Sequence, residues 1–175
     1  MSFKFTPTEI PEVVLVEATE LRDDRGFFSE IYRESEFLGI GPFVQQNVSI
    51  SNATVLRGLH YQVEPMGVGK LVTCLSGTIF DVAVDIRKDS PTYGKHITRE
   101  LSGSKSLWIP SGFAHGFYAF YDNTVVLYRQ TQYYSKEHDR SIYWKDPALD
   151  ILWPGSNRPI VSEKDSRAPL LKDLK

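Results

Sequence analysis

The sequence contains a single cysteine, Cys74, so it cannot form a disulfide bond within the chain. It also has no apolar run that approaches membrane-spanning length, and its first residues lack the long apolar centre of a signal peptide. These absences predict a cytoplasmic protein that does not act at a membrane.

The sequence also lacks a marked excess of charge of either sign. Lys and Arg number 20 against 22 Asp and Glu, so there is no global positive field of the kind that attracts long nucleic acids. We therefore expect no nucleic-acid partner. Any bound phosphate would have to meet a local cluster of arginine or lysine.

Helical periodicity is scarce, whereas short extended segments separated by turn residues recur along the chain, which at 175 residues suits one domain over residues 1–175. The clearest strand covers residues 78–87, where apolar side chains alternate with Asp81, Ala83 and Asp85, as in a half-buried strand. Further strands are expected over residues 13–16, 27–33, 43–51, 54–62, 70–75, 97–101, 106–109, 115–121 and 124–134. This pattern predicts an all-β antiparallel sandwich or barrel of the jelly-roll kind.

Only short helices are expected. One helical turn could run between a Ser35 N-cap and a stop at Gly39. From Ser135 onward, four prolines break any long element, which predicts short C-terminal helices and loops wrapped over the barrel.

Residues 54–62 place Arg57 and His60 inside what otherwise resembles a buried strand. An imidazole can take up a proton near neutral pH, which makes His60 a candidate general base, although an isolated strand histidine is more commonly a hydrogen-bonded core residue. Strict alternation puts Arg57 on the face opposite His60. Either Gly58 marks a bulge that turns Arg57 inward, or Arg57 reaches around the rim.

Residues 110–115 contain Pro-x-Gly-x-x-His, which resembles the second motif of the cupins and ends at His115. Metal-binding cupins carry further ligands in their first motif, where this chain has His60 and Gln62. Two histidines are too few for the usual ligand set, so we expect no metal and no cofactor. Asp81 or Asp85 could complete a metal site, or could hydrogen-bond a histidine such as His115; the corresponding alternative function is a metal-dependent cupin oxygenase.

Six blocks of the sequence resemble the dTDP-4-dehydrorhamnose 3,5-epimerase family and follow one another in the family's order. They are residues 24–30 (DRGFFSE), 55–62 (VLRGLHYQ), 69–72 (GKLV), 80–87 (FDVAVDIR), 112–117 (GFAHGF) and 162–165 (SEKD). Together they extend over nearly the whole chain. The resemblance implies an all-β fold, the cupin-type double-stranded antiparallel β-helix or jelly roll, with short C-terminal helices and loops.

The resemblance also implies an activity, the conversion of dTDP-4-dehydro-6-deoxy-D-glucose into dTDP-4-dehydro-L-rhamnose in dTDP-rhamnose biosynthesis. The protons on C3 and C5 are acidic because both carbons flank the C4 carbonyl, so one base and one acid on opposite faces suffice. By resemblance, His60 is the base, Asp165 holds its other ring nitrogen, and Tyr128 is the opposing proton donor. The residues implied to stabilise the negative C4 oxygen are Lys70, Arg57 and His115.

The nucleotide-binding residues implied by the resemblance are Arg25, Glu30, Gln45, Asn47, Tyr134, Asp139 and Lys164. Arginine and lysine suit a diphosphate, and a tyrosine ring suits stacking on thymine. In the family, part of this set comes from the neighbouring subunit. The resemblance therefore implies a homodimer with exchanged N-terminal strands.

The chain departs from the family pattern at some ligand-binding edges. Gln46 stands where the family commonly has Asp, Val68 where it has Gln, and Asp139 where it has Glu. These differences bear on substrate details, which keeps three further alternatives open. They are an epimerase acting on C3 or C5 only, a ketoisomerase for another deoxysugar, and a sugar-nucleotide binding module without catalysis.

Overall fold

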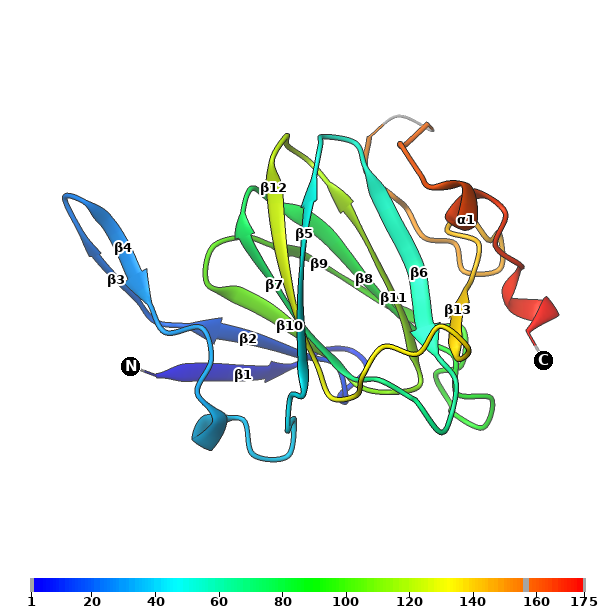
Figure 1. Ribbon diagram of the computed structural model, residues 1–175, viewed down its shortest axis with the longest axis horizontal. Coiled ribbons are helices and arrows are strands. Elements are labelled where there is room, and N and C mark those ends of the chain that lie inside the picture. Colours follow the sequence, from blue (N-terminus) through cyan, green and yellow to red (C-terminus); the bar gives the residue numbers. More distant parts are fainter. Residues whose placement is uncertain (1, 156–157, 175) are drawn as a thin grey trace.

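The structure is a computed structural model that describes residues 2–155 and 158–174, and it is built mainly from antiparallel strands (Figure 1). The strands are β1 (Phe3–Pro7), β2 (Val14–Ala18), β3 (Glu20–Asp23), β4 (Gly26–Ser29), β5 (Gln45–Ser51), β6 (Leu56–Gln62), β7 (Lys70–Ser76), β8 (Ile79–Asp85), β9 (His96–Leu101), β10 (Lys105–Ile109), β11 (Phe113–Ala119), β12 (Thr124–Gln130) and β13 (Asp139–Ser141). The helices are short: η1 (Glu34–Glu36), α1 (Glu163–Ser166) and η2 (Leu171–Asp173). Within the described residues, no helix is long and apolar enough to cross a membrane.

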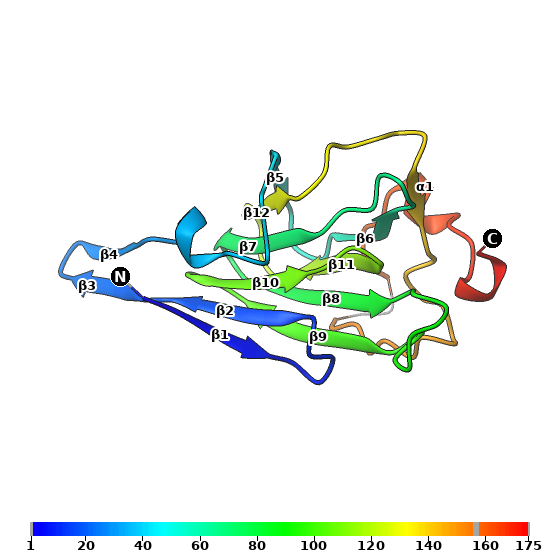
Figure 2. The ribbon, with the colours of Figure 1, turned by 90° about the horizontal axis from the view of Figure 1, so that it is seen from below.

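Two sheets form the body of the molecule. The six-stranded sheet has the order β1-β2-β10-β7-β12-β5, and the five-stranded sheet has the order β13-β6-β11-β8-β9 (Figures 1 and 2). All strand pairs within the sheets are antiparallel, which confirms the predicted jelly roll. A separate hairpin, β3–β4, extends away from this body (Figure 1).

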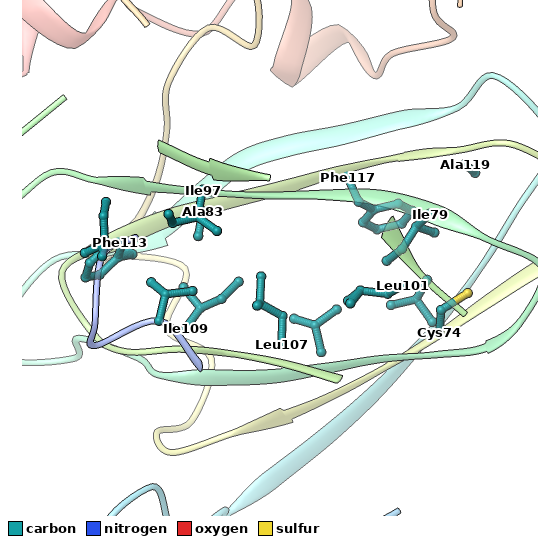
Figure 3. Packing of buried hydrophobic residues seen from close by; sticks show 14 residues of the cluster. Cys74, Ile79, Ala83, Ile97, Leu101, Leu107, Ile109, Phe113, Phe117 and Ala119 are labelled. Carbon is teal, nitrogen blue, oxygen red and sulfur yellow. The ribbon is translucent and has the colours of Figure 1, made fainter. Parts of the chain in front are cut away.

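The main core lies between the two sheets, because each sheet turns every second side chain toward the other. Figure 3 shows apolar side chains of both layers meeting there. Its buried members include Cys74, Ile79, Ala83, Ile97, Leu101, Leu107, Ile109, Phe113, Phe117 and Ala119. Cys74 is thus a buried core residue.

The strand expected over residues 78–87 is confirmed as β8, but the prediction that it is half-buried is wrong. Val82 and Val84 on one face pack beneath the C-terminal segment, against residues that include Leu171. On the other face Asp81 is fully buried. The C-terminal segment thus covers the apolar face of β8, while the face of Asp81, which alternation alone would leave to solvent, turns toward the six-stranded sheet.

The expected helical turn is present as η1, but Ser35 lies inside it and is not its N-cap. Arg33 occupies the N-cap position without a side-chain hydrogen bond. The predicted short C-terminal helices are confirmed by α1 and η2, and Ser162 caps α1 by accepting a hydrogen bond from the backbone N–H of Asp165. This cap fixes Asp165 against the barrel.

Candidate active site

A cavity of about 620 Å³ is lined by side chains of both sheets and of the C-terminal segment. The five-stranded sheet contributes Arg57, His60 and His115. The six-stranded sheet contributes Lys70 and Tyr128. Because the two sheets face each other, these polar groups approach the cavity from opposing walls.

A bulge in β6 brings Arg57 and His60 to the same side. The strand advances three residues from Arg57 to His60, whereas the paired stretch of β11, residues 115–117, advances only two. The extra residue is accommodated at Gly58, which has φ +130° and lies so close to β11 that a Cβ there would be 2.5 Å from the Cα of Gly116. Only glycine fits both requirements. The bulge confirms the first of the two alternatives for Arg57, since both side chains line the cavity.

His60 is held by a buried carboxylate. Its Nε2 lies 2.6 Å from Oδ1 of Asp165, and the second oxygen of Asp165 accepts a hydrogen bond from the N–H of Gly58 at 3.3 Å. Burial raises the pKa of the Asp165 carboxyl, but its hydrogen bonds, that of His60 first, outweigh burial and hold the pKa below its ordinary value. With Nε2 engaged, Nδ1 is the nitrogen that can accept a proton from a ligand.

A second histidine–aspartate pair lies beside the first. His115 is directly opposite His60 in the strand register, and its Nε2 lies 2.6 Å from Oδ1 of Asp81 on β8. Both side chains of this pair are buried, and Oδ2 of Asp81 has no hydrogen-bond partner among the described residues. The expected hydrogen bond between Asp81 and His115 is therefore present.

Lys70 is more buried than Arg57 and Lys164, the other lysine and arginine side chains that line the cavity. Its Nζ donates a hydrogen bond to the carbonyl oxygen of His60 at 3.2 Å. Burial lowers the pKa of Lys70 to about 8, although the nearby carboxylates of Asp139 and Asp81 act in the opposite direction. The side chain can thus change its charge within the range of pH in which the protein can be assayed.

Tyr128 enters the cavity from β12. Its ring lies edge-on to that of His115, with the centroids 6.2 Å apart, and its hydroxyl is 2.9 Å from Oγ of Ser49. Burial raises the pKa of the Tyr128 phenol, while the hydrogen bond with Ser49 and the charge of Arg57 act against the rise. The phenol therefore carries its proton at neutral pH.

At one border of the cavity, several polar side chains are linked to each other. Lys164 and Asp139 form an ion pair, and the hydroxyl of Tyr134 donates to the same carboxylate at 3.3 Å. Gln45 accepts a hydrogen bond from the backbone N–H of Tyr134 at 2.9 Å and donates to Asn47 at 3.1 Å. These contacts join β5, β13 and α1 around the cavity.

Gln62 stands where a metal-binding cupin would have a ligand. The hydrogen bonds of its side-chain amide are all made with backbone groups. It donates to the carbonyl oxygens of Met66 and Tyr133 and accepts from the N–H of Ser135. Within residues 2–155 and 158–174, no group of three or more His, Cys, Asp or Glu side chains is arranged to hold a metal ion.

Comparison with known proteins identifies the relatives of this chain. The sequence model for dTDP-4-dehydrorhamnose 3,5-epimerase matches residues 7–173. The chain is also 47% identical to the dTDP-4-dehydrorhamnose 3,5-epimerase of Sinorhizobium fredii, over 97% of this chain and 90% of that protein. The chain belongs to the dTDP-4-dehydrorhamnose 3,5-epimerase family. Its enzymatic class is therefore that of an isomerase.

Solved structures agree with the membership in this epimerase family. An epimerase of Legionella pneumophila, solved in complex with dTDP-4-keto-L-rhamnose, superposes with a TM-score of 0.94 at 41% identity, covering 99% of this chain and 95% of that one. ChmJ, a 3'-monoepimerase from Streptomyces bikiniensis solved with dTDP-quinovose, superposes with a TM-score of 0.88 at 31% identity, covering 95% and 87%. The same fold thus includes an enzyme described as acting at one carbon.

Ten residues that the sequence predicted for an epimerase site line this cavity. They are Asn47, Arg57, His60, Lys70, His115, Tyr128, Tyr134, Asp139, Lys164 and Asp165. Gln45 is not among the described residues that line the cavity, but it is hydrogen-bonded to Asn47 and Tyr134, which do line it.

Arg25 and Glu30 lie elsewhere, in and after the projecting β3–β4 hairpin (Figure 1). Arg25 occupies the turn of the hairpin, where its side chain is 90% exposed and bonds Asp23. Glu30 pairs with Arg33. Neither is among the described residues that line the cavity of their own chain.

Sequence reasoning did not single out Ser49, Phe117 or Gln130, which also line the cavity. A hydroxyl or amide on a strand has no motif of its own. The available signal was the spacing of two residues between Asn47 and Ser49, which places both side chains on one face of β5.

Proposed function

We propose that this epimerase inverts C3 and C5 of dTDP-4-dehydro-6-deoxy-D-glucose and gives dTDP-4-dehydro-L-rhamnose, as one step of dTDP-rhamnose biosynthesis. The observation that carries the proposal is the placement of His60 and Tyr128 on opposing sheets of one cavity. Inversion of a carbon requires removal of its proton from one face and delivery of a proton to the other. A cytoplasmic location and a single functional domain over residues 1–175 stay predictions.

The proposed reaction begins at His60. Its Nδ1 takes the proton from C3 or C5, and the electron pair of the broken C–H bond forms an enolate with its charge on the C4 oxygen. Asp165, bonded to Nε2, stabilises the imidazolium that results. Tyr128 then transfers its phenolic proton to the opposite face of the carbon, and the C4 carbonyl is restored.

The enolate oxygen needs positive charge or hydrogen-bond donors that are in place before the reaction starts. We assign this role to Lys70, Arg57 and His115, which are held by the backbone or by side chains of the barrel. Lys70 is bonded to the carbonyl oxygen of His60, and Arg57 donates to Ser51 Oγ at 3.1 Å. Fixed donors of this kind cost no reorganisation when the charge develops.

The nucleotide is proposed to bind at the border formed by Asn47, Tyr134 and Lys164. Tyr134 is 56% exposed, so its ring can stack on thymine, and Lys164 suits a phosphate. Gln45 and Asp139 would hold these groups in place.

Arg25 and Glu30 are proposed to act in the cavity of a second subunit, in a homodimer with exchanged N-terminal strands. Two apolar surfaces favour such a dimer. Phe27 and Phe28 are exposed by 49% and 64% on the projecting hairpin, and Val48 is 59% exposed on β5, an edge strand. Exposed apolar groups of this size commonly mark protein interfaces.

The reaction is tested by the position of deuterium in product formed in deuterated water. The wild type should carry deuterium at both C3 and C5 of the sugar, and His60→Ala should lose exchange at both. Deuterium at C3 alone or C5 alone would instead identify a single-carbon epimerase, as the structurally similar ChmJ, a 3'-monoepimerase, is described. Full activity of His60→Ala would contradict the assignment.

The dimer is tested by complementation between two inactive variants. Arg25→Ala and His60→Ala are dissociated, mixed and allowed to reassociate. If Arg25 acts in the partner's cavity, half of the random dimers are mixed and each has one intact site, so about a quarter of the activity should return. If Arg25 acts in the cavity of its own chain, one site of a mixed dimer lacks Arg25 and the other lacks His60. Activity then stays absent.

A further inference from the structure

The inward face of β5 carries three polar side chains, each hydrogen-bonded to a side chain of β12 or β6. The pairs are Asn47 with Gln130 at 3.0 Å, Ser49 with Tyr128 at 2.9 Å, and Ser51 with Arg57 at 3.1 Å. Residues 47, 49 and 51 are spaced by two, so a strand presents all three side chains on the same face, toward the cavity. The middle contact involves the proposed proton donor.

The direction of the hydrogen bond between Ser49 and Tyr128 matters for proton donation. The phenol has one hydrogen, so it can be directed either to Ser49 or to a ligand in the cavity. Only when Ser49 donates to the phenolic oxygen is the phenol hydrogen available to the substrate. A serine at this place can adopt either role, because its hydroxyl rotates.

Proton donation also leaves Tyr128 as a phenolate in a largely buried place. Burial disfavours that charge, and the negative charge of Asp81 adds to the effect. The groups that favour the phenolate are Ser49, by its hydrogen bond, and Arg57, by its positive charge. An enzyme that inverts two carbons in turn must return a proton to Tyr128 between the two events.

We propose that Ser49 is the positioning residue of the proton donor. Its Oγ–H donates to Oη of Tyr128, directs the phenol hydrogen into the cavity, and returns a proton after each transfer. In that return the Ser49 O–H bond breaks, a new Tyr128 O–H bond forms, and Ser49 takes a proton from cavity water. The hydroxide that this leaves is neutralised by the proton that the His60 imidazolium releases to solvent, so both residues return to their starting states. The half-exposed position of Ser49 allows such water access. The inference rests on the proposed epimerase function.

The test is the ratio of inversion to deuterium exchange in Ser49→Ala. Loss of one orienting hydrogen bond should lower the inversion rate about tenfold. Exchange by removal and return of a proton at His60 does not need Tyr128, so it should change much less. Tyr128→Phe combined with Ser49→Ala should be no worse than Tyr128→Phe alone, because Ser49 acts through Tyr128. Ser49→Thr, which keeps a hydroxyl, should restore the ratio.

Ser106→Ala is the matched control. Ser106 makes a buried hydroxyl–hydroxyl hydrogen bond with Thr73 at 2.7 Å in the same sheet, and it is not among the described residues that line the cavity. It should lower the melting temperature without changing the ratio. An unchanged ratio in Ser49→Ala would overturn the role of Ser49. Absence of exchange at both carbons in the wild type would overturn the proposed function itself, which separates the two failures.

Discussion

Two histidines on neighbouring strands of the same sheet, His60 on β6 and His115 on β11, each have a 2.6 Å contact between Nε2 and an aspartate oxygen. Their surroundings differ. The side chain of His60 is 33% exposed to the cavity, whereas that of His115 is 5% exposed. An equal distance therefore does not make the two pairs equal in what they can do.

The carboxylates differ as well. Asp165 comes from α1, far along the chain, and uses both oxygens, one for His60 and one for Gly58. Asp81 comes from the adjacent strand β8 and uses one oxygen within the described residues. The difference indicates that a base needs access to the ligand as well as a fixed carboxylate, whereas the buried pair mainly holds an imidazole in place.

The largest expected effect is on His60 itself. His60→Asn should lower kcat/KM by about 10³-fold, because a general base contributes roughly 10²- to 10⁴-fold to a rate. His115→Asn should lower it by about tenfold, since the role proposed for that ring is only to stabilise the C4 oxygen. Steady-state kinetics of both variants measures the contrast; equal losses would remove the distinction between the pairs.

The carboxylates should show the next largest difference. The amide of Asp165→Asn cannot accept from both His60 and Gly58, so one contact is lost, activity should fall about 10²-fold, and unfolding should become easier by about 1–3 kcal/mol. Asp81→Asn keeps one acceptor for His115. Its activity should fall less than that of Asp165→Asn, which kinetics and thermal unfolding of the two variants together would show.

A smaller effect is expected from a substitution that disturbs the bulge beside His60. In Gly116→Ala the new Cβ would lie 2.7 Å from the carbonyl oxygen of Arg57. Shifting β6 should cost about 1–3 kcal/mol of stability and should lower kcat by moving Arg57 and His60 relative to each other. Ala119→Gly on the same strand is the control, because it changes stability without touching the bulge. Wild-type kcat in Gly116→Ala would show that the close contact is not needed.

The smallest effect is a pH dependence at Lys70, next to His60. Burial places the pKa of Lys70 at about 8, below its ordinary value of 10.5, so the side chain is charged below that pH and neutral above it. Wild-type kcat/KM should therefore fall as the pH rises through about 8, and Lys70→Met should start lower and lack this decline. Asp139 and Asp81 are the carboxylates that oppose the shift.

Stability should change in the opposite direction at the same group. Between about pH 8 and 10.5 the unfolded chain keeps a proton on Lys70 that the folded chain has lost, so Lys70 makes the free energy of unfolding rise with pH in this window. Denaturant unfolding at several pH values would detect the rise as a contribution that Lys70→Met lacks. Parallel curves for the two proteins would contradict the assigned pKa.

Much of the fold could be predicted from local sequence patterns. Alternation over residues 78–87 located β8, and the strands expected over residues 54–62 and 70–75 correspond to β6 and β7. The burial of the face of β8 that carries Asp81 and Asp85 could not be predicted, because it depends on the packing of the other sheet against β8. Long-range packing of this kind leaves no periodic signal in the strand itself.

Residue type suggested chemistry at His60, and the resemblance to the family singled out Tyr128; both side chains line the cavity. The orientation of Arg57 was not, because it depends on the register between β6 and β11, and Gly58 marked only the possibility of a bulge. Arg25 and Glu30 resemble ligand-binding residues in the sequence yet lie on or just beyond the projecting hairpin. The role proposed for them depends on a second subunit.

The most direct test of the two-sided account compares Tyr128→Phe with His60→Ala in deuterated water. If His60 removes the proton and Tyr128 delivers it to the other face, His60→Ala should lose exchange and inversion together. Tyr128→Phe should keep exchange on the His60 side while losing inversion. Equal loss of exchange and inversion in Tyr128→Phe would contradict a donor role for Tyr128.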